Sequence, residues 1–449
     1  MKKILCIVIF LFNLQVYAID IHYTGDSDAV RFGISELMKA SDTTPLAITV
    51  HDSPSAIPSR CNEHDYKDGS FRITRDDSKI LVLSHDETGA MYGLLDIAET
   101  VMNSGWNAVK NKSVAPHLPF RAIKFNLPWS TYRRHESLSQ HYDTVRDLDF
   151  WSEFLDMMAK NRFNVLTLWN LHPFPYMIRP ENYPDASPFS DEELAEWQSF
   201  WHGLFEMAKN RGIDTYLVNW NIFASPSFAK KYDAADYEGK YYYGEGDTSN
   251  ILKKYNRECI TQVINEYPNL TGLGTSMGER MVGMSPANRQ KWIEDVYFAG
   301  IKSADREIQF IHRIPFSTSR EDIMVTKNSI EQSGLPSPIW TPLKFNWSHG
   351  HSSPELQIAH GGDAGNLYWS PKPDNYKMIW TVRNEDFFML NWGEPDFIRD
   401  HIRTNTHDFV GGYIIGSETY IPAKEYSLKQ DVPEWKYALD RKSTRLNSS

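Results

Sequence analysis

The sequence predicts an α/β protein in which a small α/β domain precedes a (β/α)8 TIM barrel. From residue 120 onward, eight short apolar segments of strand character alternate with helical stretches. These predicted strands are residues 121–129, 164–170, 214–221, 270–276, 307–314, 338–347, 377–384 and 409–417. Eight such units over about 300 residues match the size of a closed barrel. An open doubly wound sheet is the alternative, but it usually has fewer strands and a glycine-rich first turn, and no such turn follows Trp129.

Helices are expected between the strands because apolar residues recur there at spacings of three and four. The clearest of these stretches are residues 145–163, 191–212, 249–267 and 285–304. Together the units define a catalytic barrel over residues 119–440.

The first domain is expected over residues 19–118, with strands at 45–52, 70–76 and 79–86 and a helix at 87–102. Gly89 and Gly93 lie four residues apart on that helix, so one helical face lacks side chains and can approach a sheet closely. The polar stretch 103–117, which contains Pro116, is expected to be an extended linker, with Pro119 just beyond it.

Both ends of the chain are expected to lie outside the fold. Residues 1–18 have two lysines, a short apolar run and a small residue, Ala18, at the end, which is typical of a cleaved secretory signal. We therefore expect a secreted or periplasmic protein without a membrane segment after cleavage. The polar residues 441–449 resemble a foreign or artefactual tail. Cys61 and Cys259 fall in different predicted domains and are expected to be free thiols.

The composition restricts the class of partner. A net charge of −11 disfavours general nucleic-acid binding. The 14 Trp, 23 Tyr and 23 Phe are core material first, and only a mild indication of a surface for carbohydrate. The sequence gives no oligomeric state.

Polar and aromatic residues recur where the predicted strands end, and in such barrels the active site forms at that end. A barrel end with a purely structural role needs no such set. The predicted substrate-binding residues are Lys124, Asn126, Trp129, Trp169, Asn170, His172, Trp220, Asn221, Arg280, Arg313, Lys344, Asn346, Trp347, Arg383 and Asn384. The predicted catalytic carboxylates are Glu279, Glu385, Asp386 and Glu418.

This selection of residues suits a sugar ring. Carboxylates supply acid, base or nucleophile, amides bind hydroxyl groups, and tryptophan covers an apolar ring face. Glu279 is the predicted general acid, whose pKa would have to be raised. Its partner is predicted at Glu385 or Asp386, with Glu418 next. A carboxyl separation of about 5 Å would indicate a nucleophile, whereas about 6.5–9.5 Å would leave room for an activated water.

The cations at the strand ends have two interpretations, which the residues alone leave open. They could bind a carboxylate or sulfate on the substrate, or they could neutralise the carboxylates of the site itself.

Metal chemistry is not expected. His349 and His351 are poorly spaced for one ion, and no His-Glu-x-x-His motif or cysteine pair supports them. We predict no metal and no cofactor.

Two segments carry a resemblance to a known family. The helix "DETGAMYGLLDIAE", followed by "LPFRAIKFNLPW" opening the barrel, resembles the α-glucuronidases of glycoside hydrolase family sixty-seven. The N-terminal pattern is shared with the hexosaminidases of families twenty and eighty-four. The resemblance implies that the acid ends the fourth strand, at Glu279. Those hexosaminidases place two neighbouring carboxylates there, whereas Gly278 and Arg280 flank Glu279 here, which favours an inverting, α-glucuronidase-like reaction.

The sequence therefore predicts a glycoside hydrolase that releases a uronic acid, α-linked glucuronate, from polysaccharide-derived oligosaccharides. One alternative is a hexosaminidase or another glycosidase for acidic sugars. The other is a non-catalytic carbohydrate-binding barrel.

Overall fold

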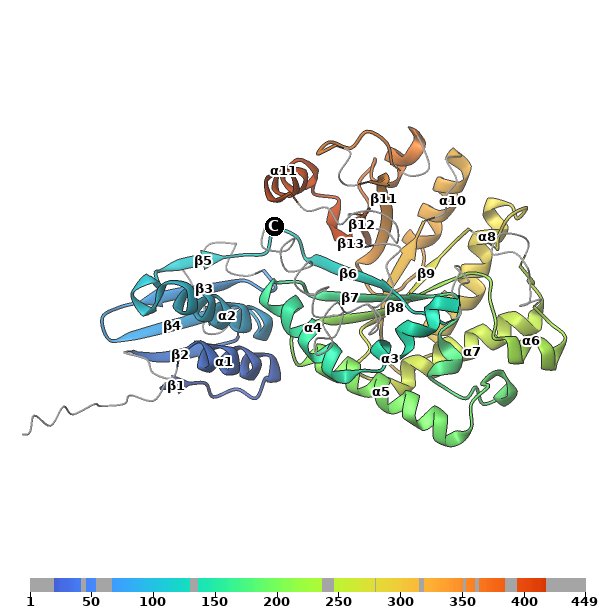
Figure 1. Cartoon of the computed structure of the whole chain (residues 1–449). Helices are drawn as coiled ribbons and strands as arrows, with labels where there is room; N and C mark the ends of the chain where they lie inside the picture. Colours follow the sequence, from blue (N-terminus) through green and yellow to red (C-terminus); the bar gives the residue numbers. More distant parts are fainter. Residues whose placement is uncertain are drawn as a thin grey trace, which may run out of the picture. The chain divides into compact units, whose positions relative to one another are not determined.

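The structure is a computed structural model of the whole chain (Figure 1). It describes residues 20–41, 46–53, 67–129, 136–235, 246–278, 280–314, 319–349, 353–359, 363–383 and 394–416. The chain divides between Pro116 and His117 into two compact units.

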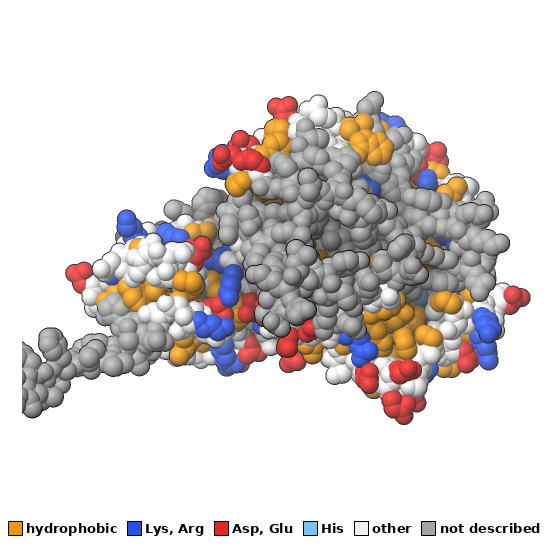
Figure 2. Space-filling view, viewed as in Figure 1, with side chains coloured by type: hydrophobic (Ala, Val, Ile, Leu, Met, Phe, Trp, Pro, Cys, Tyr) orange, Lys and Arg blue, Asp and Glu red, His pale blue; other side chains and the backbone are white. Residues whose placement is uncertain are grey.

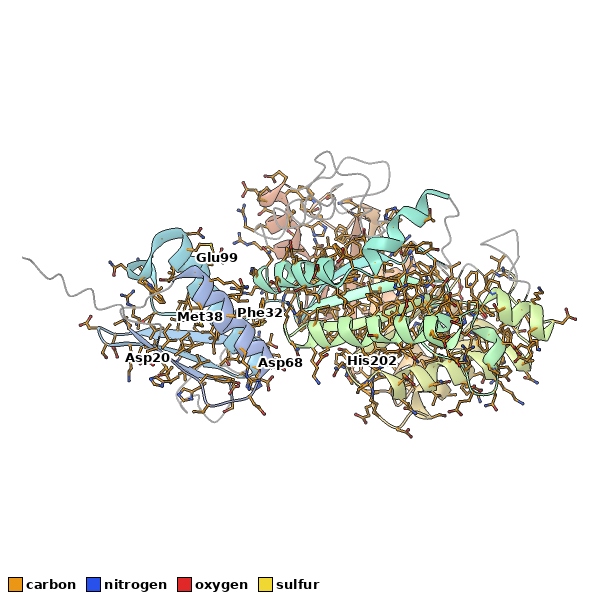
Figure 3. The ribbon with its side chains drawn as sticks, turned by 60° about the horizontal axis from the view of Figure 1, so that its bottom comes forward. Asp20, Phe32, Met38, Asp68, Glu99 and His202 are labelled. Carbon is orange, nitrogen blue, oxygen red and sulfur yellow. The ribbon has the colours of Figure 1, made fainter. Side chains whose placement is uncertain are left out.

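Among its described residues, the first unit contains a five-stranded sheet and two α-helices. The strands lie in the order β1-β2-β4-β3-β5, in which β1, β2 and β4 run parallel and β3 runs antiparallel to β4 and β5. Their bounds are β1 Ile21–His22, β2 Ala47–His51, β3 Phe71–Arg75, β4 Lys79–Ser84 and β5 Lys112–Val114. The helices α1 (Asp28–Ala40) and α2 (Glu87–Ser104) pack together against the sheet (Figure 3), and a short 3-10 helix, η3 (Trp106–Ala108), follows α2.

The predicted close approach of α2 to the sheet is confirmed. A Cβ atom added to Gly89 would lie 2.2 Å from the carbonyl oxygen of Ser70, and one added to Gly93 would lie 2.6 Å from Cγ1 of Val82. Asp86 begins the helix by accepting hydrogen bonds from the backbone N–H groups of Gly89 and Gly69, at 2.6 and 2.7 Å. Any side chain at residue 89 would force the helix away from the strands.

The linker predicted at 103–117 is wrong in part. Residues 112–114 form the edge strand β5, which pairs with β3, and α2 extends to Ser104. All three residues of β5 are exposed, so the segment lacks the apolar alternation by which a strand is recognised.

The second unit is a closed barrel of eight parallel strands, which confirms the predicted fold class. Neighbouring strands pair in the order β6-β7-β8-β9-β10-β11-β12-β13, and β13 closes on β6. Their bounds are β6 Phe120–Asn126, β7 Val165–Asn170, β8 Asp214–Trp220, β9 Gly272–Ser276, β10 Gln309–Arg313, β11 Ile339–His349, β12 Tyr376–Arg383 and β13 Val410–Ile415.

Helices surround the barrel (Figure 1). They are α3 (Tyr142–Val145), α4 (Leu148–Lys160), α5 (Asp191–Lys209), α6 (Pro226–Tyr232), α7 (Asn250–Glu266), α8 (Pro286–Ile293), α9 (Ala299–Lys302), α10 (Arg320–Glu331) and α11 (Pro395–Asn405). The short helices are η4 (Glu136–His141), η5 (Phe174–Tyr176), η6 (Pro184–Ala186) and η8 (Asp363–Tyr368), and a π-helical turn, η7 (Glu294–Phe298), joins α8 to α9. His202 on α5, labelled in Figure 3, lies 4.6 Å from the ring of Tyr267, which directly follows α7.

Apolar side chains fill the inside of the barrel. The core cluster takes alternate residues of the strands, such as Phe120 and Ala122 on β6, because successive side chains of a strand point to opposite faces. A Cβ atom added to Gly272 would lie 2.1 Å from the ring of Tyr216, so the glycine makes room for that ring.

The described surface carries both signs of charge, with blue and red side chains interspersed on the face in Figure 2. No helix among the described residues is both long and apolar enough to cross a membrane.

Candidate active site

The four predicted catalytic carboxylates, Glu279, Glu385, Asp386 and Glu418, lie outside the described residues, as does Asn384. The backbone of Arg383 is described at the end of β12, but its side chain is not. The catalytic roles therefore stay predictions. The structure describes most of the residues that were predicted to bind substrate.

The inward rows of the barrel end on cations and tryptophans. Lys124 continues the row of Phe120 and Ala122 on β6, and Trp169 and Trp220 belong to the core cluster at the ends of β7 and β8. Because side chains alternate along a strand, these residues point to the same interior, at the carboxyl end of the strands. The predicted gathering of distant residues is seen for these three side chains.

Four side chains meet there, and we call them the barrel-mouth cluster: Lys124, Trp169, Trp220 and Arg313. The Lys124 Nζ atom lies 4.4 Å from the centre of the Trp169 ring and 5.7 Å from that of Trp220. The guanidinium carbon of Arg313 lies 5.7 Å from the Trp169 ring, and the two indoles meet edge to face at 5.3 Å. Two cations from different strands thus lie within cation–π distance of one aromatic ring.

The segment after β9 adds a third cation. Arg280 is buried, and its guanidinium carbon lies 5.5 Å from the ring of Phe223, a member of the barrel core cluster. Its backbone is held on both sides: its N–H donates to the carbonyl of Asn221 at 3.4 Å, and its carbonyl accepts from Gly246 at 2.7 Å. Arg313 also donates to Oγ of Ser276, the last residue of β9, at 2.9 Å.

Asn221 organises the ends of β8 and β9. Its backbone N–H donates to the carbonyl of Ser276 at 3.2 Å, and its side-chain amide donates to Oγ1 of Thr275. Its Oδ1 atom accepts from the indole N–H of Trp292 on α8 at 3.0 Å. Both ends of the Asn221 amide are used by the protein, so Asn221 supports the fold at this position, and its predicted contact with substrate stays a prediction.

Three other predicted binding residues are buried within the fold. Trp129 stacks on Tyr176 at 4.7 Å, Asn170 donates to the carbonyl of Trp129, and Oδ1 of Asn170 accepts from the backbone N–H of His172 at 2.9 Å. The His172 Nε2 atom lies 2.7 Å from the hydroxyl of Tyr255, and burial lowers the pKa of His172 to about 3. All three side chains contact other residues of the fold, and their predicted contact with substrate stays a prediction.

The remaining predicted residues lie on β6 and β11. Asn126 is buried and is paired in register with Trp169. Lys344 is half-buried and paired with Thr381 on β12. Asn346 is buried, whereas Trp347 is half exposed.

Two contributors were missed by the sequence prediction. Ser276 binds Arg313, and Phe223 packs against Arg280. Ser276 had a usable signal, because it ends the inward row of Gly272 and Gly274 on β9. Phe223 had none, since it follows the strand in a loop.

Among the described residues, no three His, Cys, Asp or Glu side chains are grouped so that they could hold a metal ion. Cys259 is a buried free thiol, and Cys61 lies outside the described residues.

Solved structures of glycoside hydrolases share the (β/α)8 barrel fold of this chain. A GH138 enzyme targeting pectin rhamnogalacturonan II superposes with a TM-score of 0.74 at 20% identity, over 96% of this chain and 50% of that one. The chitobiase of Flavobacterium johnsoniae gives a TM-score of 0.58 at 12% identity, over 96% of this chain and 69% of that one. A GH115 4-O-methyl-α-glucuronidase gives 0.50 at 13% identity, over 95% and 56%.

These likenesses establish the fold. The chain spans half the length of the GH138 enzyme. No family model matches the sequence, and no curated protein matches it. The glycoside hydrolase fold predicted from the sequence is confirmed, while membership of family sixty-seven is not shown.

Proposed function

We propose that the protein is a glycoside hydrolase that releases a uronic acid, α-linked glucuronate, from polysaccharide-derived oligosaccharides. The observation that carries this proposal is the barrel-mouth cluster, in which Lys124 and Arg313 flank the Trp169 ring. A uronate offers an apolar ring face and one carboxylate, and the cluster offers aromatic rings and cations.

The burial of the cations supports the same conclusion. Lys124 is 6% exposed and Arg280 is 8% exposed. Attraction between opposite charges is screened less in a buried site than at the surface, so both cations would act strongly on the carboxylate of an anionic substrate.

The reaction follows from the predicted carboxylates. The Glu279 carboxyl donates its proton to the glycosidic oxygen as the bond from that oxygen to the anomeric carbon breaks. A carboxylate from residue 385, 386 or 418 removes a proton from water, whose oxygen bonds to the anomeric carbon. Water is consumed, and the products are the free uronic acid and an alcohol on the remaining oligosaccharide.

Two of the structurally similar glycoside hydrolases support an acidic sugar as the substrate. One is a 4-O-methyl-α-glucuronidase with specificity for decorated arabinogalactans, and another targets a pectin. Several others are β-N-acetylglucosaminidases or hexosaminidases, which is the alternative for this chain.

A panel of aryl glycosides tests the substrate. The protein is incubated with 4-nitrophenyl glucuronide and galacturonide of both anomers, the matching glucoside, and the N-acetylglucosaminide. Oligosaccharides from glucuronoxylan and pectin are tested beside them. We expect release of uronic acid, and loss of that release in Glu279→Gln. Cleavage of the amino sugar alone would establish the hexosaminidase alternative, and retention of polysaccharide without cleavage would establish a binding barrel.

We also propose export from the cytoplasm, on the strength of residues 1–18. N-terminal sequencing of the exported protein should begin at Ile19, and a start at Met1 would contradict cleavage.

A further inference from the structure

The four tryptophans that were predicted to cover a sugar ring differ in solvent exposure. Trp129 and Trp169 are 2% exposed and Trp220 is 4% exposed, whereas Trp347 is 50% exposed. Stacking on a pyranose needs an accessible ring face. Among these four, Trp347 therefore has the most accessible indole.

Trp347 lies in a β-bulge near the carboxyl end of β11. Lys344 pairs with Thr381, and the next pair joins His349 to Arg383, so four residues of β11 stand opposite one residue of β12. Extra residues of this kind bend the strand and redirect a side chain, and they are frequent at barrel rims beside active sites. Trp347 lies inside this bulge.

The backbone of the bulge adopts a conformation that these residue types rarely take. Asn346 has φ 41° and Trp347 has φ 58°, and both values fall in the left-handed region. For a bulky side chain such a φ is uncommon and persists only where the surroundings impose it, which occurs most often at ligand-binding sites.

Two neighbours of Trp347 impose this backbone. Phe345 is fully buried, with its ring 5.5 Å from Trp380 and 4.3 Å from His401. The Asn346 Oδ1 atom accepts from the backbone N–H groups of residues 357 and 358, at 2.8 and 3.1 Å, and its Nδ2 donates to the carbonyl of residue 355 at 3.0 Å. Residues 345 and 346 are thus anchored inward, and the indole that follows is left at the surface.

The structure assigns Trp347 to a second sugar subsite, where the indole stacks on the apolar face of the pyranose next to the uronate, on its leaving-group side. Asn346 is the positioning residue for that indole. The inference rests on the proposed function and extends it. The cations gather around Trp169 in the barrel interior, whereas Trp347 lies three residues beyond Lys344, toward the carboxyl end of β11, so we place it at the part of the substrate further from the uronate.

The test compares two substrates of the whole protein. One is an aryl uronide, which has no second sugar, and the other is a uronic acid-bearing oligosaccharide. We expect Trp347→Ala to lower kcat/KM on the oligosaccharide by about tenfold, through a higher KM, and to change it by less than about twofold on the aryl uronide. Trp347→Phe should recover most of the loss. Met102→Ala, at another highly exposed apolar residue in the first unit, is the matched control and should change neither value.

The role of Asn346 is tested with the same pair of substrates. Asn346→Ala should reproduce the selective loss on the oligosaccharide, and Asn346→Asp, which keeps the acceptor for two N–H groups, should recover most of it. Equal losses on both substrates, or no loss on either, would overturn the assignment.

The assignment of Trp347 can still be tested if the proposed function is wrong. If no uronide is cleaved, affinity electrophoresis in gels containing glucuronoxylan, pectin or a neutral xylan compares the wild type with Trp347→Ala. Loss of retardation in the variant would still support a sugar platform at Trp347. Equal retardation of both proteins, or none, would overturn it.

Discussion

Lys124→Met is the sharpest single test of anion binding at the barrel mouth. Lys124 is 6% exposed, and its Nζ atom lies over the Trp169 ring at 4.4 Å. Methionine keeps most of the length and apolar volume of the side chain and removes the charged ammonium group. The perturbation therefore separates electrostatics from packing.

The expected size of the effect follows from the burial of Lys124. A carboxylate about 4 Å from the ammonium group, at an effective dielectric constant of about 20, is attracted by about 4 kcal/mol. The carboxylate loses part of its hydration when it enters the site, and we take about half of the attraction as the net effect, about 2 kcal/mol. This corresponds to a loss of about 30-fold in kcat/KM.

The stability of the fold should hardly change. The cation–π contact with Trp169 contributes about 1–2 kcal/mol, and the desolvation of the ammonium group offsets it. We expect the free energy of unfolding of Lys124→Met to stay within about 1 kcal/mol of the wild type.

The assay measures kcat/KM for a 4-nitrophenyl uronide and for the matching glucoside, in which a hydroxymethyl group replaces the carboxylate. The loss should be confined to the uronide and should shrink as salt is added, since exposed parts of the attraction are screened. An equal loss on both substrates would refute the reasoning, because it would mean that Lys124 acts through the fold or on the site's own carboxylates.

Three further predictions concern stability and side-chain burial. Gly89→Ala should lower the free energy of unfolding by about 2–3 kcal/mol, because its Cβ would lie 2.2 Å from a backbone oxygen. Gly203→Ala on α5, whose Cβ would lie 3.5 Å from Cδ1 of Leu148, should leave stability unchanged or raise it; thermal unfolding compares them. Burial lowers the pKa of His172 from 6.5 to about 3, so the unfolded chain binds the proton first, and His172 alone should lower the free energy of unfolding by about 2 kcal/mol between pH 7 and pH 5, beside the buried His312 and His401, whose pKa values are also lowered. Urea unfolding should show a smaller fall in His172→Gln. Burial raises the pKa of the Cys259 thiol well above its ordinary value, so iodoacetamide should label the Cys259 peptide only after unfolding, and labelling of the native protein would contradict this.

The barrel could be predicted from sequence because its strands are buried on both faces. Such strands read as apolar runs bounded by turns, and β7 and β9 are buried at every position. β5 could not be predicted, because three exposed residues at a sheet edge leave no apolar pattern. Its pairing with β3 is a property of the folded sheet.

The candidate site could be predicted only in part from the sequence. Alternation along a strand is enough to place Lys124 and Trp220 on the inward rows, because the rows begin in the core. The alternation does not indicate which polar side chains form hydrogen bonds within the fold. Asn170 and Asn221 end neighbouring strands and look equivalent in sequence, yet their amides serve backbone and side-chain groups more than 40 residues away in the chain, for instance Trp129 and Trp292.

The difference between Trp169 and Trp347 shows why a site cannot be read from strand ends alone. Both residues lie at or next to the end of a predicted strand and follow an apolar run. The regular alternation of β7 continues through Trp169 and carries it into the core, whereas β11 loses its alternation within the bulge after Lys344. That bulge is fixed by the amide of Asn346 reaching residues 355–358, a contact between segments whose spacing no periodic pattern encodes. Periodicity therefore locates the side chains that point into the barrel, and local hydrogen bonds between side chain and backbone decide which aromatic ring is exposed beyond the regular strand.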